Sequence, residues 1–593
     1  MKSEIHKRLA ALRAEMKELN LDAWYISGTD PHASEYLPDR WQTRKFISGF
    51  SGSYGMVVVT QNEAALWTDS RYFLQAAGQL EGTGIEMQKL RVPDAMLPEE
   101  WIGNKLAKGS RVGMDTQTIS VKAYKTFEYE LGKKGIALVE TADLFEKIWE
   151  NRPSISSNMV FEPDLKYTGL PRKEKQQQLI ALTKKAGSDF HLITMLDELA
   201  WQFNLRGSDI SYNPVFYGFA LIGANESYLF VEQNKLDDKT QNSLINDGVV
   251  LKDYSTFYTF LSELKGRNIF IDTATANFKA YSNLLPDNSL MEGTSIVSLL
   301  KARKNNTELD GFRKAMLKDG VALTKFLFWL KNNVGKNQIN AYDAGVKLKE
   351  FRAKQNGFKG ESFPPIVGYK SQGAIVHLSV GADDALPIEA DGILLFDSGG
   401  QYFEGTTDIT RTVTLGKISE QQKNDYTLVL KGMIALSMAK FPYGTKGCHL
   451  DILARKPLWE QGLNYGHGTG HGVGHFLNVH EGPMAIRQDY NPNFIEPGHV
   501  VSNEPALYRE GQYGIRIENM IACIELEETG YGKFLGFETL TLCPIDLNLV
   551  QTELLSPVEK EWLNDYHEKV KKALEPLLED KYHAFLDELT QPF

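Results

Sequence analysis

Glycine-separated histidines form the part of this sequence best suited to chemistry. Residues 465–475 read YGHGTGHGVGH, residues 478–483 read NVHEGP, and six of the twelve histidines lie between His449 and His499. Glycine lacks the Cβ that would block close approach to a bound group. Imidazole binds metals and transfers protons near neutral pH. The stretch therefore predicts a site for a metal ion or a reacting substrate.

Carboxylates flank this stretch on both sides. Upstream, Asp397 ends an apolar run and Asp408 lies in a threonine-rich segment; downstream, Glu504 precedes a proline and Glu518 follows the sequence GIRI. Apolar runs, period-two alternation and glycine-bearing turns predict that each pair lies on the two strands of a hairpin. Two such hairpins could bring four carboxylates towards one point.

Each carboxylate also has an ordinary structural explanation. These are a turn that binds backbone amides for Asp397, a cross-strand pair with Arg411 or Lys417 for Asp408, a strand end for Glu504, and an ion pair with Arg516 for Glu518. Four separate accidents around one glycine-histidine stretch are a poorer explanation than one shared site. Like charges held together raise one another's pKa, so convergence requires compensation.

Two divalent cations would compensate four carboxylates, with a neutral His471 completing the ligand set. An oxygen-rich set favours Mn²⁺, Fe²⁺ or Co²⁺, with Zn²⁺ as an alternative. A water that bridges two metals loses a proton near neutral pH and becomes a nucleophile, so metal-assisted hydrolysis is the leading reaction class. The sequence contains no GxGxxG, GxSxG or HExxH motif at this stretch, which argues against a dinucleotide enzyme or a serine hydrolase.

Length and composition agree with a globular enzyme. A chain of 593 residues predicts about three to four domains. The net charge of -11 argues against a general nucleic-acid binder. Three cysteines without CxxC spacing indicate neither a disulfide framework nor a structural zinc site. The N-terminus lacks an apolar signal region and no run of about 18 apolar residues occurs, so we expect a cytoplasmic protein without a membrane segment.

The elements that must position this site follow a repeated α/β pattern. Helix, strand and hairpin signals occur in the same order twice, at residues 1–20, 23–26 and 55–68 and again at 177–185, 191–194 and 218–231. Asn62 and Asn225 occupy equivalent turns, so we predict an internal duplication. The polar segment 151–158 separates a first domain, 1–155, from a second, 156–303.

The remaining residues, 304–593, form the third predicted domain and contain the candidate site. Thr307 can cap a helix that continues past Gly320 towards Leu330. The capping box Ser556 to Glu559 predicts another helix near the end of the chain. We expect an α/β (α+β) protein with two similar N-terminal domains and one C-terminal catalytic domain.

At these residues the sequence resembles the pita-bread metallopeptidases, which include methionine aminopeptidase, prolidase, aminopeptidase P and the non-metal enzyme creatinase. Their five ligand positions match Asp397, Asp408, His471, Glu504 and Glu518 in order and spacing. The resemblance implies that Asp397 holds one metal, that His471 and Glu504 hold the other, and that Asp408 and Glu518 bridge both. It also implies creatinase-like N-terminal domains and a pita-bread catalytic domain.

Over essentially the whole chain the sequence is similar to the long, three-domain, cytosolic-type aminopeptidases P (Xaa-Pro aminopeptidases). These enzymes release the N-terminal residue from peptides with proline in the second position. The resemblance implies two divalent cations, here expected to be Mn²⁺, a short peptide substrate and a homodimer. Two alternatives stay open: prolidase, which hydrolyses only dipeptides, and a catalytically inactive peptide-binding relative.

The resemblance also assigns roles to residues near the metals. His377, His467 and His480 are expected to bind substrate and move protons, and Glu504 to take the proton of the attacking water. His377 equally fits a buried core histidine, and Leu378 replaces an aromatic residue frequent in the family. His475 has no family counterpart and is expected to be structural.

Arg71 is the one candidate from the first domain. In family members this domain approaches the active site, so Arg71 is expected to bind substrate and to limit the cleft to short peptides. An ion pair with Asp69 is an equally good explanation of Arg71.

Overall fold

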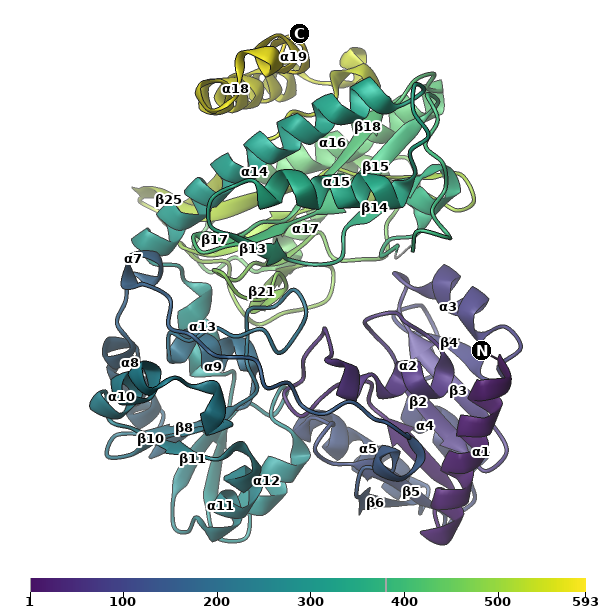
Figure 1. The fold of residues 1–593 in the computed structure, drawn as a ribbon, viewed down its shortest axis with the longest axis vertical. Coiled ribbons are helices and arrows are strands. Elements are labelled where there is room, and N and C mark those ends of the chain that lie inside the picture. Colours follow the sequence, from purple (N-terminus) through teal and green to yellow (C-terminus); the bar gives the residue numbers. More distant parts are fainter. Residues whose placement is uncertain (1, 379–380) are drawn as a thin grey trace. The chain divides into compact units, whose positions relative to one another are not determined.

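The computed structural model describes residues 2–378 and 381–593, and the chain divides into two compact units (Figure 1). The first unit runs to Pro163 and includes Leu170–Leu299; the second comprises Asp164–Gly169 and Leu300–Phe593. Within the described ranges, no helix has the length and apolar character needed to cross a membrane.

The first unit contains two six-stranded sheets with the same topology. Their strand orders are β4-β3-β2-β1-β5-β6 and β10-β9-β8-β7-β11-β12. The strands are β1 Ala23–Ile26, β2 Met56–Thr60, β3 Ala64–Thr68, β4 Glu86–Lys89, β5 Arg111–Asp115, β6 Ala137–Thr141, β7 Phe190–Ile193, β8 Phe219–Gly223, β9 Ser227–Phe230, β10 Val249–Lys252, β11 Asn268–Ile271 and β12 Ser289–Glu292. The hairpins β2–β3 and β8–β9 turn at Asn62 and Asn225, so the predicted internal duplication is confirmed.

Amphipathic helices pack beside these sheets. The helices are α1 Lys2–Glu18, α2 Thr43–Ser48, α3 Phe73–Leu80, α4 Pro98–Lys105, α5 Val121–Lys133, α6 Phe145–Ile148, α8 Arg172–Lys185, α9 Leu196–Gln202, α10 Asp238–Asn246, α11 Phe257–Glu263, α12 Phe278–Leu284 and α13 Ile296–Ala302. In α1 the residues Ile5, Leu9, Leu12 and Met16 are buried in one core cluster. Their spacing of three to four residues is what predicted this helix.

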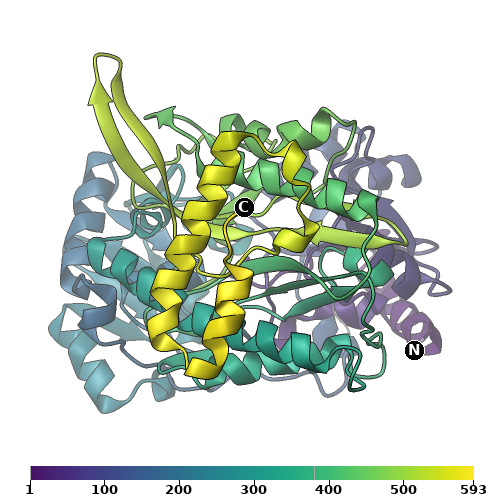
Figure 2. The same cartoon turned by 90° about the horizontal axis from the view of Figure 1, so that it is seen from above.

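The second unit is built from antiparallel sheets. Their strand orders are β13-β16-β17, β14-β15-β18, β19-β26-β25-β22-β20-β21 and β23-β24. The strands are β13 Phe358–Glu361, β14 Ile366–Tyr369, β15 Ile393–Ser398, β16 Gly400–Tyr402, β17 Gly405–Thr406, β18 Ile409–Thr414, β19 Phe441–Pro442, β20 Gly470–Gly472, β21 Glu481–Ile486, β22 Val500–Asn503, β23 Ala506–Arg509, β24 Tyr513–Arg516, β25 Asn519–Thr529 and β26 Gly532–Thr539. The β25–β26 hairpin extends well beyond its neighbours (Figure 2).

Helices cover these sheets and form a common core with them. They are α7 Leu165–Thr168, α14 Asn306–Asn333, α15 Ala341–Ala353, α16 Glu420–Ser437, α17 Gly447–Trp459, α18 Pro557–Leu574 and α19 His583–Leu589. Helices α14 and α15 run beside β14, β15 and β18 (Figure 1) and share a buried cluster that includes Phe326, Leu348 and Phe396.

The N-cap of α14 differs from the prediction. Asn305, not Thr307, caps the helix: its side chain accepts from the amide of Glu308, whose carboxylate in turn accepts from the amide of Asn305. Asparagine with glutamate three residues later makes this reciprocal pair, which Thr307 at the second helical position is too late to form. The predicted capping box from Ser556 to Glu559 is confirmed at the start of α18.

Gly399 lies where the strand that contains Asp397 meets the segment that contains Asp408. A Cβ at Gly399 would lie 1.9 Å from the carbonyl oxygen of Thr407 and 2.2 Å from Oγ of Ser362. Ser362 Oγ also donates to Thr407 O at 2.8 Å, so the neighbours are fixed by their own hydrogen bond. The two segments approach this closely because residue 399 has no side chain.

We predict that Gly399→Ala lowers the free energy of unfolding by about 1–3 kcal/mol, because the added methyl group overpacks a fixed backbone contact. Chemical denaturation of the metal-free protein measures this change. Gly530→Ala is the matched control, since a Cβ there would meet nothing within 4 Å. Equal stability of the two variants would contradict the prediction.

Candidate metal centre

Two of the candidate ligands belong to the β14-β15-β18 sheet. Asp397 is the penultimate residue of β15 and pairs with Thr410 of β18, while Asp408 directly precedes β18. The threonine-rich segment is a strand as predicted, but Asp408 lies just outside it. Both side chains are buried, with 8% and 4% of their residue surfaces exposed. This antiparallel pair of strands therefore places two carboxylates at the same end of one sheet.

The other three candidates belong to the large six-stranded sheet. His471 is the middle residue of β20, Glu504 directly follows β22, and Glu518 directly precedes β25. Strands β22 and β25 pair with Asn503 opposite Asn519, which sets the two glutamates side by side at the strand ends. The amide of Glu518 donates to Thr410 O at 3.1 Å, joining this sheet to the first.

The structure brings the side chains of these residues together. His471 Nε2 lies 3.4 Å from both Asp408 Oδ2 and Glu504 Oε1. Asp408, His471 and Glu518 each offer a ligand atom within 4.8 Å of the others. The Nδ1–H of His471 donates to Gly472 O at 2.9 Å, which orients the ring so that Nε2 faces the carboxylates.

Burial and charge repulsion make this cluster costly without cations. Burial raises the pKa of Asp397 to about 7, and the charges of Asp408 and Glu504 act in the same direction, although Arg516 opposes them. Burial also raises the pKa of Glu504 and, most strongly, of Glu518. For His471 burial favours the neutral ring, but Asp408 and Glu504 outweigh it and raise the pKa to about 9.

The donor set fits divalent cations. Four carboxylates and one imidazole are hard or borderline ligands, and within the described chain Oδ1 of Asp397 is buried without a hydrogen-bond partner. Positive charge at the centre would satisfy that oxygen and reverse the pKa shifts.

Nearby arginines do not make the ion pairs considered from the sequence. Arg516 Nη2 donates to Asp397 Oδ2 at 2.6 Å, and the ion pairs that the described residues form do not join Arg516 to Glu518. Arg411 binds the backbone of Glu518 and the side chain of Asn519 instead of the carboxylate of Asp408. Structural salt bridges therefore do not account for Asp408 and Glu518.

Tyr508 is a residue of this site that sequence reasoning missed. Its hydroxyl lies 2.9 Å from His467 Nε2 and accepts from Arg516 Nη1 at 2.5 Å. His467 Nδ1 bonds Gly468 O at 2.7 Å and lies 4.0 Å from Glu504 Oε2. Tyr508 comes four residues after Glu504, on the hairpin that leads to Arg516, and this position next to a candidate ligand was the available signal.

The remaining histidines have distinct surroundings. The ring of His480 packs edge-on against His471 with centroids 4.4 Å apart. The residue after His480, Glu481, is fixed by the buried ammonium groups of Lys301 and Lys304. His475 is buried and packs edge-on against Phe312 of α14.

His377 and Arg71 are the other two predicted site residues. His377 is half-buried and follows a short 3₁₀ turn at Lys370–Ala374. Arg71, in the first unit, donates twice to Asp69 at 2.9 Å and lies 3.8 Å from Glu35. The ion pair of Arg71 with Asp69 thus forms, although the side chain is only 18% exposed.

Family profiles cover nearly the whole chain. Metallopeptidase family M24 matches residues 310–525, and the C-terminal region of peptidase M24 matches residues 533–593. Creatinase/prolidase N-terminal domains match residues 8–148 and 151–308.

Individual relatives agree with these profiles. A probable Xaa-Pro aminopeptidase P of Coprinopsis cinerea is 40% identical, covering 98% of this chain and 96% of its own. Xaa-Pro aminopeptidase 1 of Dictyostelium discoideum is 38% identical, covering 98% and 94%. The crystal structure of X-prolyl aminopeptidase from Caenorhabditis elegans, described as a cytosolic enzyme with a di-nuclear active site, superimposes with a TM-score of 0.96 at 34% identity, covering 99% and 100%. By fold, by profile and by full-length identity, this chain belongs to metallopeptidase family M24, with creatinase-type domains before its pita-bread catalytic domain.

Proposed function

We propose that this chain is a dimetal aminopeptidase that releases the N-terminal residue from peptides whose second residue is proline. The observation that carries the proposal is the convergence of Asp408, His471, Glu504 and Glu518, with Asp397 close enough for its pKa to respond to the charges of Asp408 and Glu504. Relatives named Xaa-Pro aminopeptidase at about 40% identity over the full length support the substrate class.

The proposed ligands are the five residues Asp397, Asp408, His471, Glu504 and Glu518, with Asp397 on one cation, His471 and Glu504 on the other, and Asp408 and Glu518 shared. When bound, two divalent cations would acidify a shared water and polarise the substrate carbonyl. We propose Mn²⁺ as the metal because oxygen ligands dominate, with Co²⁺, Fe²⁺ and Zn²⁺ as alternatives.

The chain's own groups would move the protons. Glu504 is the proposed base that takes the proton of the attacking water, because its Oε1 lies at the centre, 3.4 Å from His471 Nε2. The three histidines His377, His467 and His480 are proposed to hold the substrate, to donate to the oxyanion and to protonate the departing proline nitrogen. That nitrogen carries no hydrogen before cleavage, so it needs a donor to leave as an amine.

The domain boundaries, the location in the cell and the oligomeric state complete the proposal. We divide the chain into domains at 1–155, 156–303 and 304–593, supported by the two duplicated sheets and the order of the family profiles. We propose a cytoplasmic location, as for the C. elegans enzyme, and free cysteines fit it. We also propose a homodimer by family resemblance; light scattering that gives the mass of one chain would reject it.

The decisive test is turnover of a small peptide panel with and without Mn²⁺. We expect the wild-type protein to release arginine from Arg-Pro-Pro in a metal-dependent reaction. Asp408→Asn should lower kcat/KM by at least about 10³-fold, because a shared ligand loses its charge. Circular dichroism checks that the variant is folded, and undiminished activity would reject the assignment.

The same panel separates the alternatives. Hydrolysis of Arg-Pro without Arg-Pro-Pro would identify a prolidase. Peptide binding without hydrolysis, in a protein that retains no metal after dialysis, would identify an inactive relative.

The pKa shifts predict how stability and metal binding depend on pH. The pKa of Asp397 is raised from 3.8 to about 7, and that of His471 from 6.5 to about 9. Over these ranges the metal-free folded protein holds more protons than the unfolded chain, so its free energy of unfolding falls as the pH rises. Cations replace those protons and remove the penalty.

We therefore expect the increase in Tm on adding Mn²⁺ to chelator-treated protein to be larger at pH 8 than at pH 5.5. Differential scanning calorimetry at both pH values measures it. Asp408→Asn provides the control that lacks a shared ligand. An increase in Tm that does not depend on pH would show that protons and cations do not compete for these residues.

Arg71 is proposed to bind substrate and to limit peptide length. We expect Arg71→Ala to raise kcat/KM for a long Xaa-Pro peptide relative to a tripeptide by several-fold. The reason is that removal of the side chain would widen the cleft that Arg71 is proposed to limit. The ratio is independent of the folded fraction. Arg91→Ala is the matched control, since Arg91 contacts the same Asp69 at 3.7 Å but is 51% exposed. An unchanged ratio in Arg71→Ala would restrict Arg71 to its ion pair.

A further inference from the structure

A single arginine connects the proposed shared ligands to the end of the chain. Arg411 lies on β18, three residues after Asp408, and is fully buried. Its guanidinium donates to Thr410 O at 3.0 Å, Glu518 O at 2.5 Å, Asn519 Oδ1 at 2.8 Å, Cys543 O at 2.8 Å, Pro544 O at 3.0 Å and the Tyr566 hydroxyl at 2.9 Å. The salt bridges of the described residues include none to Arg411, so its guanidinium is held by these hydrogen bonds and not by a direct ion pair.

Strand β18 holds Glu518 at three points. The amide of Glu518 donates to Thr410 O at 3.1 Å, its carbonyl accepts from Arg411, and its Oε2 accepts from Thr410 Oγ1 at 2.8 Å. Glu518 lies between strands β24 and β25 and is not one of the paired residues of either strand. The direction of its carboxylate therefore depends on where β18 and the Arg411 guanidinium hold this peptide.

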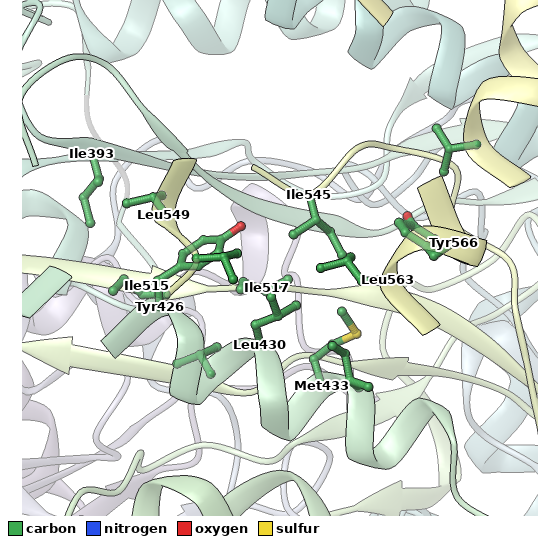
Figure 3. Close-up of a cluster of buried hydrophobic side chains, with 14 of the residues drawn as sticks. Ile393, Tyr426, Leu430, Met433, Ile515, Ile517, Ile545, Leu549, Leu563 and Tyr566 are labelled. Carbon is green, nitrogen blue, oxygen red and sulfur yellow. The ribbon is translucent and has the colours of Figure 1, made fainter. Parts of the chain in front are cut away.

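Helix α18 in turn fixes the Arg411 guanidinium through Tyr566. The Tyr566 hydroxyl accepts from Arg411 Nη2 and lies 3.3 Å from the Cys543 amide, 2.8 Å from Cys543 O and 3.2 Å from Thr541 O. A hydroxyl has one proton and two lone pairs, so this position satisfies it fully. Leu563, one turn earlier, points into the same buried cluster as Ile517 (Figure 3).

Without the Tyr566 hydroxyl, the Arg411 guanidinium would be able to shift, but it would keep other hydrogen-bond partners. Nη2 of Arg411 has two hydrogens and three acceptors within reach, namely Asn519 Oδ1, Cys543 O and the Tyr566 hydroxyl. Without the phenol oxygen, Nη2 keeps only Asn519 Oδ1 and Cys543 O as acceptors, so the guanidinium shifts away from α18 and towards Asn519, the residue after Glu518. We therefore expect loss of the hydroxyl to displace Glu518 while the domain stays folded.

We propose that Tyr566 is a positioning residue for Glu518, acting through Arg411, and that the C-terminal helix α18 is for this reason part of the metal centre. The proposal rests on the proposed function, because it takes Glu518 as a metal ligand. Groups that orient a ligand from behind affect metal affinity about 10–100-fold. A helix that served only to cover the core would affect stability alone.

The test compares two tyrosines of the C-terminal region in the full-length protein. In Tyr566→Phe the hydroxyl that binds Arg411 is removed. In the matched control, Tyr582→Phe, the lost hydroxyl belongs to a buried ring that packs edge-on against Phe328 at 5.1 Å. Each chelator-treated variant is titrated with Mn²⁺ by isothermal calorimetry, and the Tm of its metal-free form is measured separately.

We expect Tyr566→Phe to weaken the binding of at least one Mn²⁺ ion about tenfold, while Tyr582→Phe binds as wild type. Arg411→Lys, which keeps a cation but loses the planar fork, should weaken binding at least as much. Wild-type Mn²⁺ affinity in Tyr566→Phe would overturn the positioning role and leave the proposed function intact. Absence of stoichiometric Mn²⁺ binding by the wild-type protein would overturn both.

Discussion

Repulsion among buried carboxylates is the constraint on which the second unit of this structure depends. Asp397, Asp408 and Glu518 are all less than a tenth exposed, and Glu504 joins them from an adjacent strand end. A chain does not bring such groups together without compensation, because each raises the pKa of the next. The carboxylate cluster therefore needs positive charge at its centre, and divalent cations match its donor atoms.

The scaffold resists that repulsion by rigid pairing. Two antiparallel strands hold Asp397 and Asp408, three strands of another sheet hold the remaining candidate ligands, and one amide-to-carbonyl bond from Glu518 to Thr410 joins the sheets. Two arginines contact the candidate ligands. Arg516 binds the carboxylate of Asp397, and Arg411 binds the backbone carbonyl of Glu518. These two guanidinium groups reduce the repulsion among the carboxylates without occupying the centre of the cluster.

Around this frame the polar groups form connected chains, and the connections suggest how parts far apart in the sequence contribute. Asp397, Arg516, Tyr508 and His467 are joined in one series of hydrogen bonds. Glu518, Arg411 and Tyr566 form another, which ends on α18. The proposed chemistry would thus use side chains whose orientation is set by residues that touch neither metal nor substrate.

Local sequence was enough to predict much of this. Periodicity located the first helix, the strand Ala23–Ile26 and both N-terminal hairpins, because each pattern reports which face of an element is buried. Strand signals beside Asp397, Asp408, Glu504 and Glu518 predicted that these carboxylates converge, and the structure brings them together around His471. The N-cap preference alone did not locate the start of α14, because two suitable residues lie close together: Asn305, and not Thr307, caps the helix.

Other features were decided only by the tertiary structure. The sequence left open an ion pair of Arg516 with Glu518 along one strand, but in the folded chain the Arg516 guanidinium binds Asp397, which is 119 residues away. Tyr508 gave no local signal beyond its position near Glu504, and Tyr566 gave none, since their roles depend on hydroxyl partners from other elements. Sequence spacing fixes which side chains share a strand, whereas hydrogen bonds between strands and helices depend on how the sheets pack, and no local pattern contains that information.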